Sequence, residues 1–115
     1  MKLVSVPLRE EEIQKLKGKG AYHKLTADIE KKVLVIGGSL HADAEELLLR
    51  EGSNQDDIWG GGIDLEKRKI ETTAVLNLRP RLDNDGLEIL DPKRREKFIS
   101  LVKMVFKKLW KQKRT

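Results

Sequence analysis

The sequence predicts a single α+β domain over residues 1–115, with a mainly antiparallel sheet of about five strands, a short N-terminal helix and a long C-terminal helix on one face. The chain of 115 residues is close to the commonest domain size. Strand-like stretches outnumber helical ones and are joined by short turns, which favours antiparallel pairing. The last helical stretch carries apolar side chains at helical spacing, so one of its faces can pack on the sheet.

The N-terminal third contains three predicted strands and one predicted helix. Residues 2–6 are apolar enough for a short strand, and residues 9–17 have acids in the first helical turn and lysines in the last, which complements the helix dipole. Residues 21–29 alternate between two faces, as a strand does. Residues 33–36 are apolar on both faces, which is expected of a central strand covered on both sides.

Residues 43–50 have two interpretations. Asp43 followed by Glu46 resembles the start of a capped helix, and Gly52 is suited to end one. The leucine run 47–49, followed by a turn-like Gly-Ser-Asn, equally fits a buried strand that enters a hairpin. We expect the strand, by a small margin.

The next strands are predicted from alternation and from glycine. Residues 56–66 indicate a broken strand, because three consecutive glycines mark a bulge or a close approach of backbones. Residues 70–79 form the clearest alternating pattern, with Asn77 and Arg79 on one face. Residues 86–90 follow turn-like sequence and predict one more short strand.

The C-terminal segment is strongly basic. Asp91 is the predicted N-cap of a helix whose first residue is Pro92. Residues 93–115 contain ten Lys and Arg and a single Glu, whereas the whole chain carries a net charge of +5. We expect a core-packing helix with a solvated lysine face and a frayed end at 111–115. The alternative is nucleic-acid contact, through the basic residues Lys107, Lys108, Lys111, Lys113 and Arg114.

Composition narrows the class of protein. The absence of cysteine excludes disulfides and thiolate zinc sites. No apolar run approaches the roughly 20 residues of a bilayer span, and no signal peptide is visible, so we expect a cytoplasmic protein. Abundant Lys and Glu are typical of thermophiles, which favours a bacterial or archaeal source.

The stretch IGGSLHADAEE holds the candidate metal ligands. It follows a predicted strand but lacks the Gly-Lys-Ser/Thr ending of a phosphate loop, and its acids would repel phosphate. His41, Asp43 and Glu45 lie on one side if the segment is a strand, and His41 and Glu45 do so if it is a helix. A nitrogen and two carboxylates suit a divalent metal. Capping and structural hydrogen bonds are the alternative role, and His23 is expected to be a satisfied core or edge residue.

Arg79 is the candidate anion-binding residue. An arginine that projects from a well-formed strand can fork onto a carboxylate or a phosphate. Either Arg79 pairs with an internal acid, for which Asp43, Glu45 and Asp57 are available, or it faces a ligand.

Several short motifs occur in a characteristic order: ADIE, GGSLHADAE, GSNQDDIWG, LNLRPR, and then Asp-Pro before a basic helix. In this order the chain resembles, over roughly residues 20–105, a family of small bacterial and cyanobacterial proteins catalogued only as a domain of unknown function. The resemblance implies no activity or cofactor. It implies that seven residues belong to the pattern of the family, namely His41, Asp43, Gln55, Asp57, Trp59, Asn77 and Arg79.

The leading hypothesis is a non-catalytic binding or interaction protein with a polar sheet face that takes an anionic ligand or a protein partner. The candidate residues of that face are His41, Asp57, Trp59, Asn77 and Arg79. The alternative is a small metal-assisted hydrolase or nuclease that uses His41, Asp43 and Glu45. No cofactor other than that divalent metal is expected, and the sequence leaves open whether the protein is an enzyme.

Overall fold

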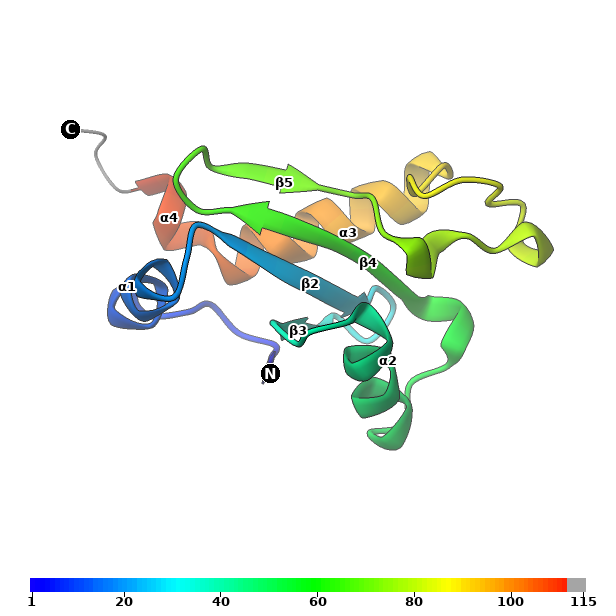
Figure 1. The fold of residues 1–115 in the computed structure, drawn as a ribbon, viewed down its shortest axis with the longest axis horizontal. Helices are drawn as coiled ribbons and strands as arrows, with labels where there is room; N and C mark the ends of the chain where they lie inside the picture. Colours follow the sequence, from blue (N-terminus) through cyan, green and yellow to red (C-terminus); the bar gives the residue numbers. More distant parts are fainter. Residues whose placement is uncertain (112–115) are drawn as a thin grey trace.

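A five-stranded antiparallel sheet forms the centre of the molecule, and helices lie on both of its faces in the computed structural model, which describes residues 1–111 (Figure 1). The strands are β1 (Lys2–Val4), β2 (Tyr22–Asp28), β3 (Val33–Ile36), β4 (Ile58–Asp64) and β5 (Lys69–Glu71). The α-helices are α1 (Glu10–Gly18), α2 (His41–Arg50), α3 (Pro92–Val105) and α4 (Lys107–Lys111). Three short 3-10 helices complete the fold, η1 (Gln55–Asp57), η2 (Val75–Asn77) and η3 (Pro80–Leu82).

The strand order is β1-β3-β2-β4-β5, and every neighbouring pair is antiparallel. The longest pairing joins β2 to β4, from Tyr22 opposite Asp64 to Asp28 opposite Ile58. The predicted antiparallel sheet of about five strands is therefore confirmed, as are the short N-terminal helix and the long C-terminal helix.

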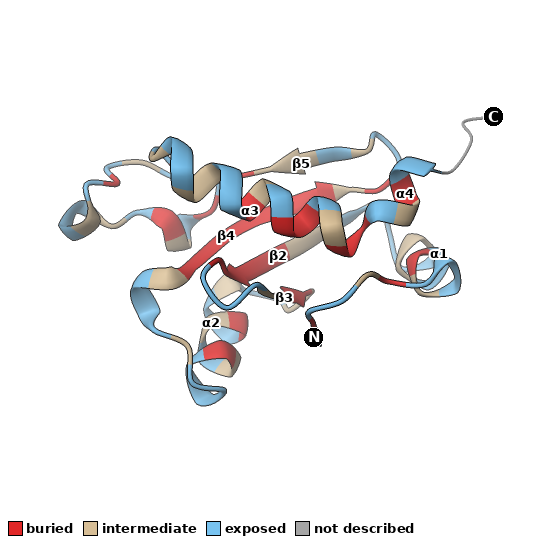
Figure 2. Ribbon diagram, turned by 180° about the vertical axis from the view of Figure 1, so that it is seen from behind, coloured by how far each residue is buried: buried red, intermediate tan, exposed pale blue. Residues whose placement is uncertain are grey.

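The main core lies between the sheet and the C-terminal helices. Phe98, Val102 and Val105 of α3 are completely buried against it, while the outward side of α3 is exposed (Figure 2). Asp91 caps α3 by accepting a hydrogen bond from the backbone N–H of Arg94 at 2.9 Å, as the Asp-Pro pair predicts. The chain breaks its helical path after α3 and continues as α4.

The predicted strand at 47–49 is wrong, because this segment belongs to helix α2. Ala44 and Leu48 are four residues apart and share one helical face, which packs on Val35 and Ile58 of the sheet. Leu49 points away and is exposed. The local sequence of the leucine run is compatible with both a helix and a strand. The helix forms because its apolar face covers the second apolar face of the sheet.

The predicted break in the strand at 56–66 is also wrong, since β4 runs through its glycines and pairs with β2 along its whole length. Of the two meanings predicted for the glycines, close approach is the one observed. A Cβ on Gly61 would lie 2.2 Å from the carbonyl oxygen of Glu71 and 2.8 Å from Cζ of Phe98. Glycine thus lets helix α3 pack directly on the backbone of the longest strands.

The predicted strand at 70–79 is mostly absent. β5 ends at Glu71, and the chain then forms two 3-10 turns, while the predicted strand at 86–90 contributes only an isolated bridge between Thr73 and Glu88. Ala74 donates its backbone N–H to the carbonyl of Leu87, so this region forms a loop folded on itself. Alternation in sequence does not distinguish such an extended loop from a strand.

Among residues 1–111 no helix is both long enough and apolar enough to cross a membrane. Lys111 is the last residue of α4, and the remainder of the end expected to fray, with Lys113 and Arg114, lies outside the described residues.

Candidate functional site

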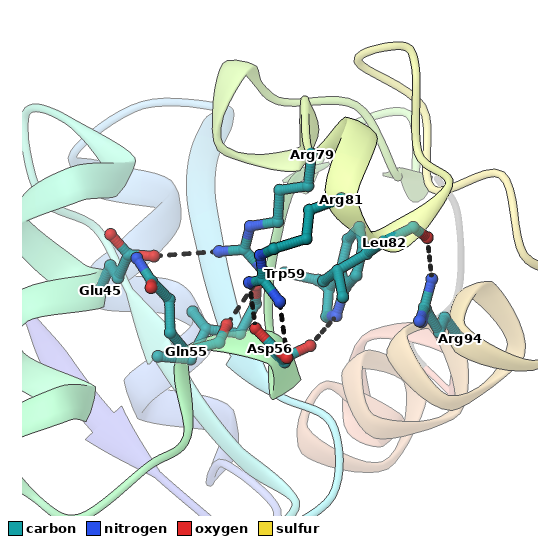
Figure 3. Close-up of polar contacts among 9 residues, drawn as sticks. Glu45, Gln55, Asp56, Trp59, Arg79, Arg81, Leu82 and Arg94 are labelled. Carbon is teal, nitrogen blue, oxygen red and sulfur yellow. Dashed lines mark hydrogen bonds and ion pairs between the residues drawn. The ribbon is translucent and has the colours of Figure 1, made fainter.

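Arg79 is held inside the molecule by three acceptors. Its Nη1 donates to the carbonyl oxygens of Gln55 at 2.9 Å and Ile58 at 2.7 Å, and its Nη2 donates to Glu45 Oε2 at 3.0 Å (Figure 3). The side chain is only 11% exposed, and burial lowers the pKa of Arg79 from its usual value. Of the two roles considered for Arg79, internal pairing is the one observed, and its partner is Glu45 of α2.

Trp59 lies between two guanidinium groups. The Cζ atoms of Arg79 and Arg94 are 5.1 Å and 5.0 Å from the centre of its ring, which is cation–π distance. Its Nε1 donates to the carbonyl of Asp56 at 3.0 Å, and Trp59 is completely buried. The six residues of this arrangement are called the Trp59 cluster: Glu45, Asp56, Trp59, Arg79, Arg81 and Arg94.

The Trp59 cluster fastens the segment of η2 and η3 to the rest of the fold. Arg94 of α3 donates to the carbonyl of Leu82 at 3.1 Å. Arg81 pairs with Asp56 through two hydrogen bonds at the surface, and this bond holds the pKa of the Asp56 carboxyl below its usual value. The cluster joins α2, β4, η3 and α3, so its contacts hold these elements together.

Asn77 acts in place of a missing strand. Its Oδ1 accepts the backbone N–H of Gly60 at 2.8 Å, and its Nδ2 donates to the carbonyls of Gly60 at 2.9 Å and Leu87 at 3.0 Å. The side chain is completely buried. Asn77 and Arg79 therefore do not form a polar sheet face open to a ligand.

His41 begins helix α2 and lies across the glycines of β4. Its Nε2 is 2.9 Å from the carbonyl oxygen of Gly61, and a carbonyl only accepts, so Nε2 carries the proton. In the neutral ring Nδ1 is then an acceptor, and no group among residues 1–111 bonds to it. A Cβ on Gly60 would lie 3.0 Å from Cδ2 of His41, so glycine makes room for the ring.

The three candidate metal ligands do not converge. His41 bonds to Gly61, Glu45 pairs with Arg79, and Asp43 is exposed on α2. Within residues 1–111 no group of three or more His, Cys, Asp or Glu is placed to hold a metal ion. Asp57 is half-buried in η1, and its backbone carbonyl accepts the N–H of Ile29 at 3.0 Å.

A groove of about 540 Å³ opens beside His41, between the start of α2 and η2. It is lined by Lys24, Leu40, His41, Ala42, Ala74, Val75 and Leu76, and is called the His41 groove. Leu40 is 61% exposed and Val75 is 76% exposed, so two large apolar side chains on its walls face water. Exposed apolar surface in a concave site is typical of a binding site.

Lys24 is the cation of the His41 groove. Its Nζ donates to the carbonyl of Ser39 at 2.9 Å in an exposed hydrogen bond, while the residue as a whole is half-buried. None of the ion pairs within residues 1–111 involves Lys24. A cation beside apolar walls and without a carboxylate partner can attract the anionic group of a ligand.

Comparison with protein families identifies the chain. Residues 2–105 match the family described as protein of unknown function (DUF5674). The chain belongs to this family. The predicted membership of a family of unknown function is thereby confirmed, whereas a bacterial or cyanobacterial origin is not shown. The match begins at residue 2, while the motifs covered roughly residues 20–105. No curated protein and no solved structure matches the chain.

Sequence reasoning missed the walls of the His41 groove. One signal was present: Val75 is apolar on the otherwise polar face of the predicted strand 70–79. The other was Leu40, an apolar residue at the N-cap position of α2, where a polar residue usually stands. Among the candidate nucleic-acid contacts, Lys107 and Lys111 are exposed on α4 and Lys108 is half-buried.

Proposed function

We propose that the protein is a non-catalytic binding protein, and that the His41 groove takes a small acidic molecule with an apolar body. The observation that supports this most is the half-buried Lys24 beside apolar walls, without a carboxylate partner in residues 1–111. The proposal keeps the anionic ligand expected from the sequence and moves its place from the sheet face around Arg79 to the groove.

The chemistry of the groove accounts for both halves of such a ligand. Leu40, Val75 and Leu76 supply apolar contact, and the acidic group is expected to sit near Lys24. Nδ1 of His41 adds one hydrogen-bond acceptor for a hydroxyl or amide of the ligand. A volume of about 540 Å³ suits a small molecule better than a folded partner.

The metal-assisted hydrolase or nuclease has less support. It needs His41, Asp43 and Glu45 on one ion, and two of them already bond to Gly61 and Arg79. The binding role uses the observed positions unchanged.

The test uses two fluorescent probes with the same apolar body. The first, 8-anilinonaphthalene-1-sulfonate, carries an anion, and the second, N-phenyl-1-naphthylamine, is neutral. Val75→Asn should weaken both probes by about tenfold, because losing an apolar wall costs roughly 1.5 kcal/mol. Lys24→Met should weaken only the anionic probe, by about fivefold, since about 1 kcal/mol of charge attraction is lost.

Leu87→Asn is the matched control, because Leu87 is an exposed leucine that does not line the groove. It should leave both probes unchanged. Melting curves confirm that each variant is folded, since the anionic probe also binds partly unfolded chains. If Val75→Asn and Lys24→Met bind both probes like the parent, the groove is not the site.

The cytoplasm is the proposed location, and a thermophilic bacterium or archaeon is the proposed source. These two proposals rest on the composition of the chain.

A further inference from the structure

Three segments that are far apart in the sequence gather cations at one end of the molecule. They are the end of α1 with the residue after it (15–19), the turn between β4 and β5 (64–69), and α4 (107–111). Figure 1 shows all three at the end of the molecule opposite α2. This surface, residues 15–19, 64–69 and 107–111, is called the basic end.

Packing holds the three segments of the basic end together. Ile13 of α1, Leu65 of the turn and Leu109 of α4 belong to one buried cluster. The backbone N–H of Leu65 donates to the carbonyl of Ala21 at 2.8 Å, which ties the turn to the loop after α1. The basic end is therefore a fixed surface.

His23 fixes the last turn of α1. Its Nε2 lies 2.8 Å from the carbonyl oxygen of Leu16 and 2.9 Å from that of Gly20, and it donates to both. Leu16 belongs to the last turn of α1 and Gly20 lies just beyond the helix, so His23 ties the two together. The backbone that carries the lysines of this turn is thus held in place by His23.

Most cations of the basic end lack acidic partners among residues 1–111. Seven of them form no ion pair within residues 1–111, namely Lys15, Lys19, Arg68, Lys69, Lys107, Lys108 and Lys111. The same segments contain two acids, Asp64 and Glu66. Asp64 is engaged in the turn, where its Oδ1 accepts the N–H groups of Glu66 and Lys67. Two of the three acids in the first turn of α1 are also engaged, because Glu11 pairs with Arg9 and Glu12 pairs with Lys2 and Arg9.

We propose that the basic end binds the phosphate backbone of a nucleic-acid duplex. Clustered lysines and arginines on a fixed surface gain affinity by releasing the counterions condensed on the duplex. The sequence indicated only the C-terminal helix for this contact, whereas the fold adds α1 and the β4–β5 turn. The site is separate from the His41 groove and independent of its ligand.

A membrane surface fits the basic end less well. Surface-bound helices insert large apolar side chains beside their lysines. Trp110 is the one large apolar side chain of the basic end (15–19, 64–69 and 107–111) that is exposed. The exposed aliphatic residues, such as Leu40, Val75 and Leu87, belong to other segments.

The test measures binding of the full chain to a fluorescein-labelled 20-base-pair DNA duplex by anisotropy at several salt concentrations. Three double variants each remove two of the three cations of one segment: Lys15→Gln with Lys19→Gln, Arg68→Gln with Lys69→Gln, and Lys107→Gln with Lys111→Gln. Each should weaken binding and reduce the slope of log affinity against log salt by about one to two, since each phosphate contact contributes about 0.9.

The matched control is Arg50→Gln with Lys93→Gln, which removes two exposed cations elsewhere. It should keep both the affinity and the slope of the parent. A control that weakens binding as much as the three test variants would make net charge the cause and overturn the proposal. Absence of duplex binding at 50 mM salt would also overturn it, as would binding only to vesicles of phosphatidylserine and phosphatidylcholine. If one variant fails to fold, the other two carry the test.

Discussion

The Trp59 cluster and the basic end are both rich in cations, but the cations are used in opposite ways. Arg79 is withdrawn from water and has a carboxylate, two carbonyls and an aromatic ring as partners. Lys107 and Lys111 are exposed and form no ion pair within residues 1–111. A buried cation is tolerated only with partners, whereas an exposed one needs none. Cations that retain their water shell are therefore the better candidates for contact with outside anions.

The largest effect is expected at Arg79. Arg79→Ala leaves Glu45 without its partner in a partly buried site, and should lower the free energy of unfolding by about 3–5 kcal/mol. Urea denaturation measures this change. Arg79→Lys should recover little of it, since a lysine cannot reproduce the fork or the stacking on Trp59. A loss below about 1 kcal/mol for Arg79→Ala would instead indicate a solvated cation.

Asn77 should come next. Asn77→Ala leaves the N–H and carbonyl of Gly60 without their side-chain partners in the interior, which is expected to cost about 2–3 kcal/mol. The same denaturation experiment measures it. Asn77→Asp keeps an acceptor for the Gly60 N–H but loses both amide donors, so it should not restore stability. Parent-like stability of the alanine variant would show that the loop does not need this side chain.

Arg81 provides a contrast within the Trp59 cluster. It pairs with Asp56 at the surface, and both side chains are exposed. Arg81→Ala should therefore have only a small effect on the free energy of unfolding, far below that of Arg79→Ala. The effect of Arg81→Ala should also decrease in 1 M salt, whereas that of Arg79→Ala should persist, because salt screens exposed charges more than buried ones. Equal losses at the two arginines would remove the distinction between them.

The lysines of the basic end should matter least for stability. Lys107→Gln with Lys111→Gln should change the free energy of unfolding by no more than about 0.5 kcal/mol, because neither residue has an ion-pair partner within residues 1–111. Thermal melting of the two-residue variant measures this. A larger loss would show that these lysines are part of the fold, like Arg79.

The ion pair of Glu12, beside the basic end, should make the stability of the protein depend on pH. The Glu12 carboxylate accepts the backbone N–H of Arg9 and pairs with Lys2, which lowers the pKa of Glu12 from 4.5 to about 2. A lowered pKa in the folded state means that this stabilisation is present above pH 4.5 and is lost as the pH falls to about 2. The melting temperatures of the parent and Glu12→Gln should differ at pH 6 and converge near pH 2. A constant difference would assign the effect to something other than ionisation.

Elements with strong local signals were predicted well. The dipole-matched charges of 9–17 and the Asp-Pro pair before α3 act within a few residues, and both helices form. The leucine run 47–49 and the alternating segment 70–79 were predicted wrongly. Their conformations depend on distant groups, the apolar face around Val35 for α2 and the backbone of Gly60 for the loop at Asn77.

The candidate site was predicted only in part. The sequence selected His41, Trp59, Asn77 and Arg79 as candidates, and all four make specific contacts within the fold. It gave internal pairing as one of two roles for Arg79, and it did not indicate that Asn77 and Trp59 are completely buried in contacts within the fold. The sequence does not distinguish a polar side chain that binds a ligand from one that bonds to a backbone carbonyl of the same chain.

The sequence by itself determined the fold class, the family and the concentration of charge in the C-terminal segment, since these follow from local periodicity, motif order and composition. Only the tertiary structure decided which cations are paired and which are free to meet an outside anion. That distinction depends on which groups from distant segments lie close together and out of contact with water. Glu45 meets Arg79 across 34 residues, while the end of α1, the β4–β5 turn and α4 meet with few acids between them.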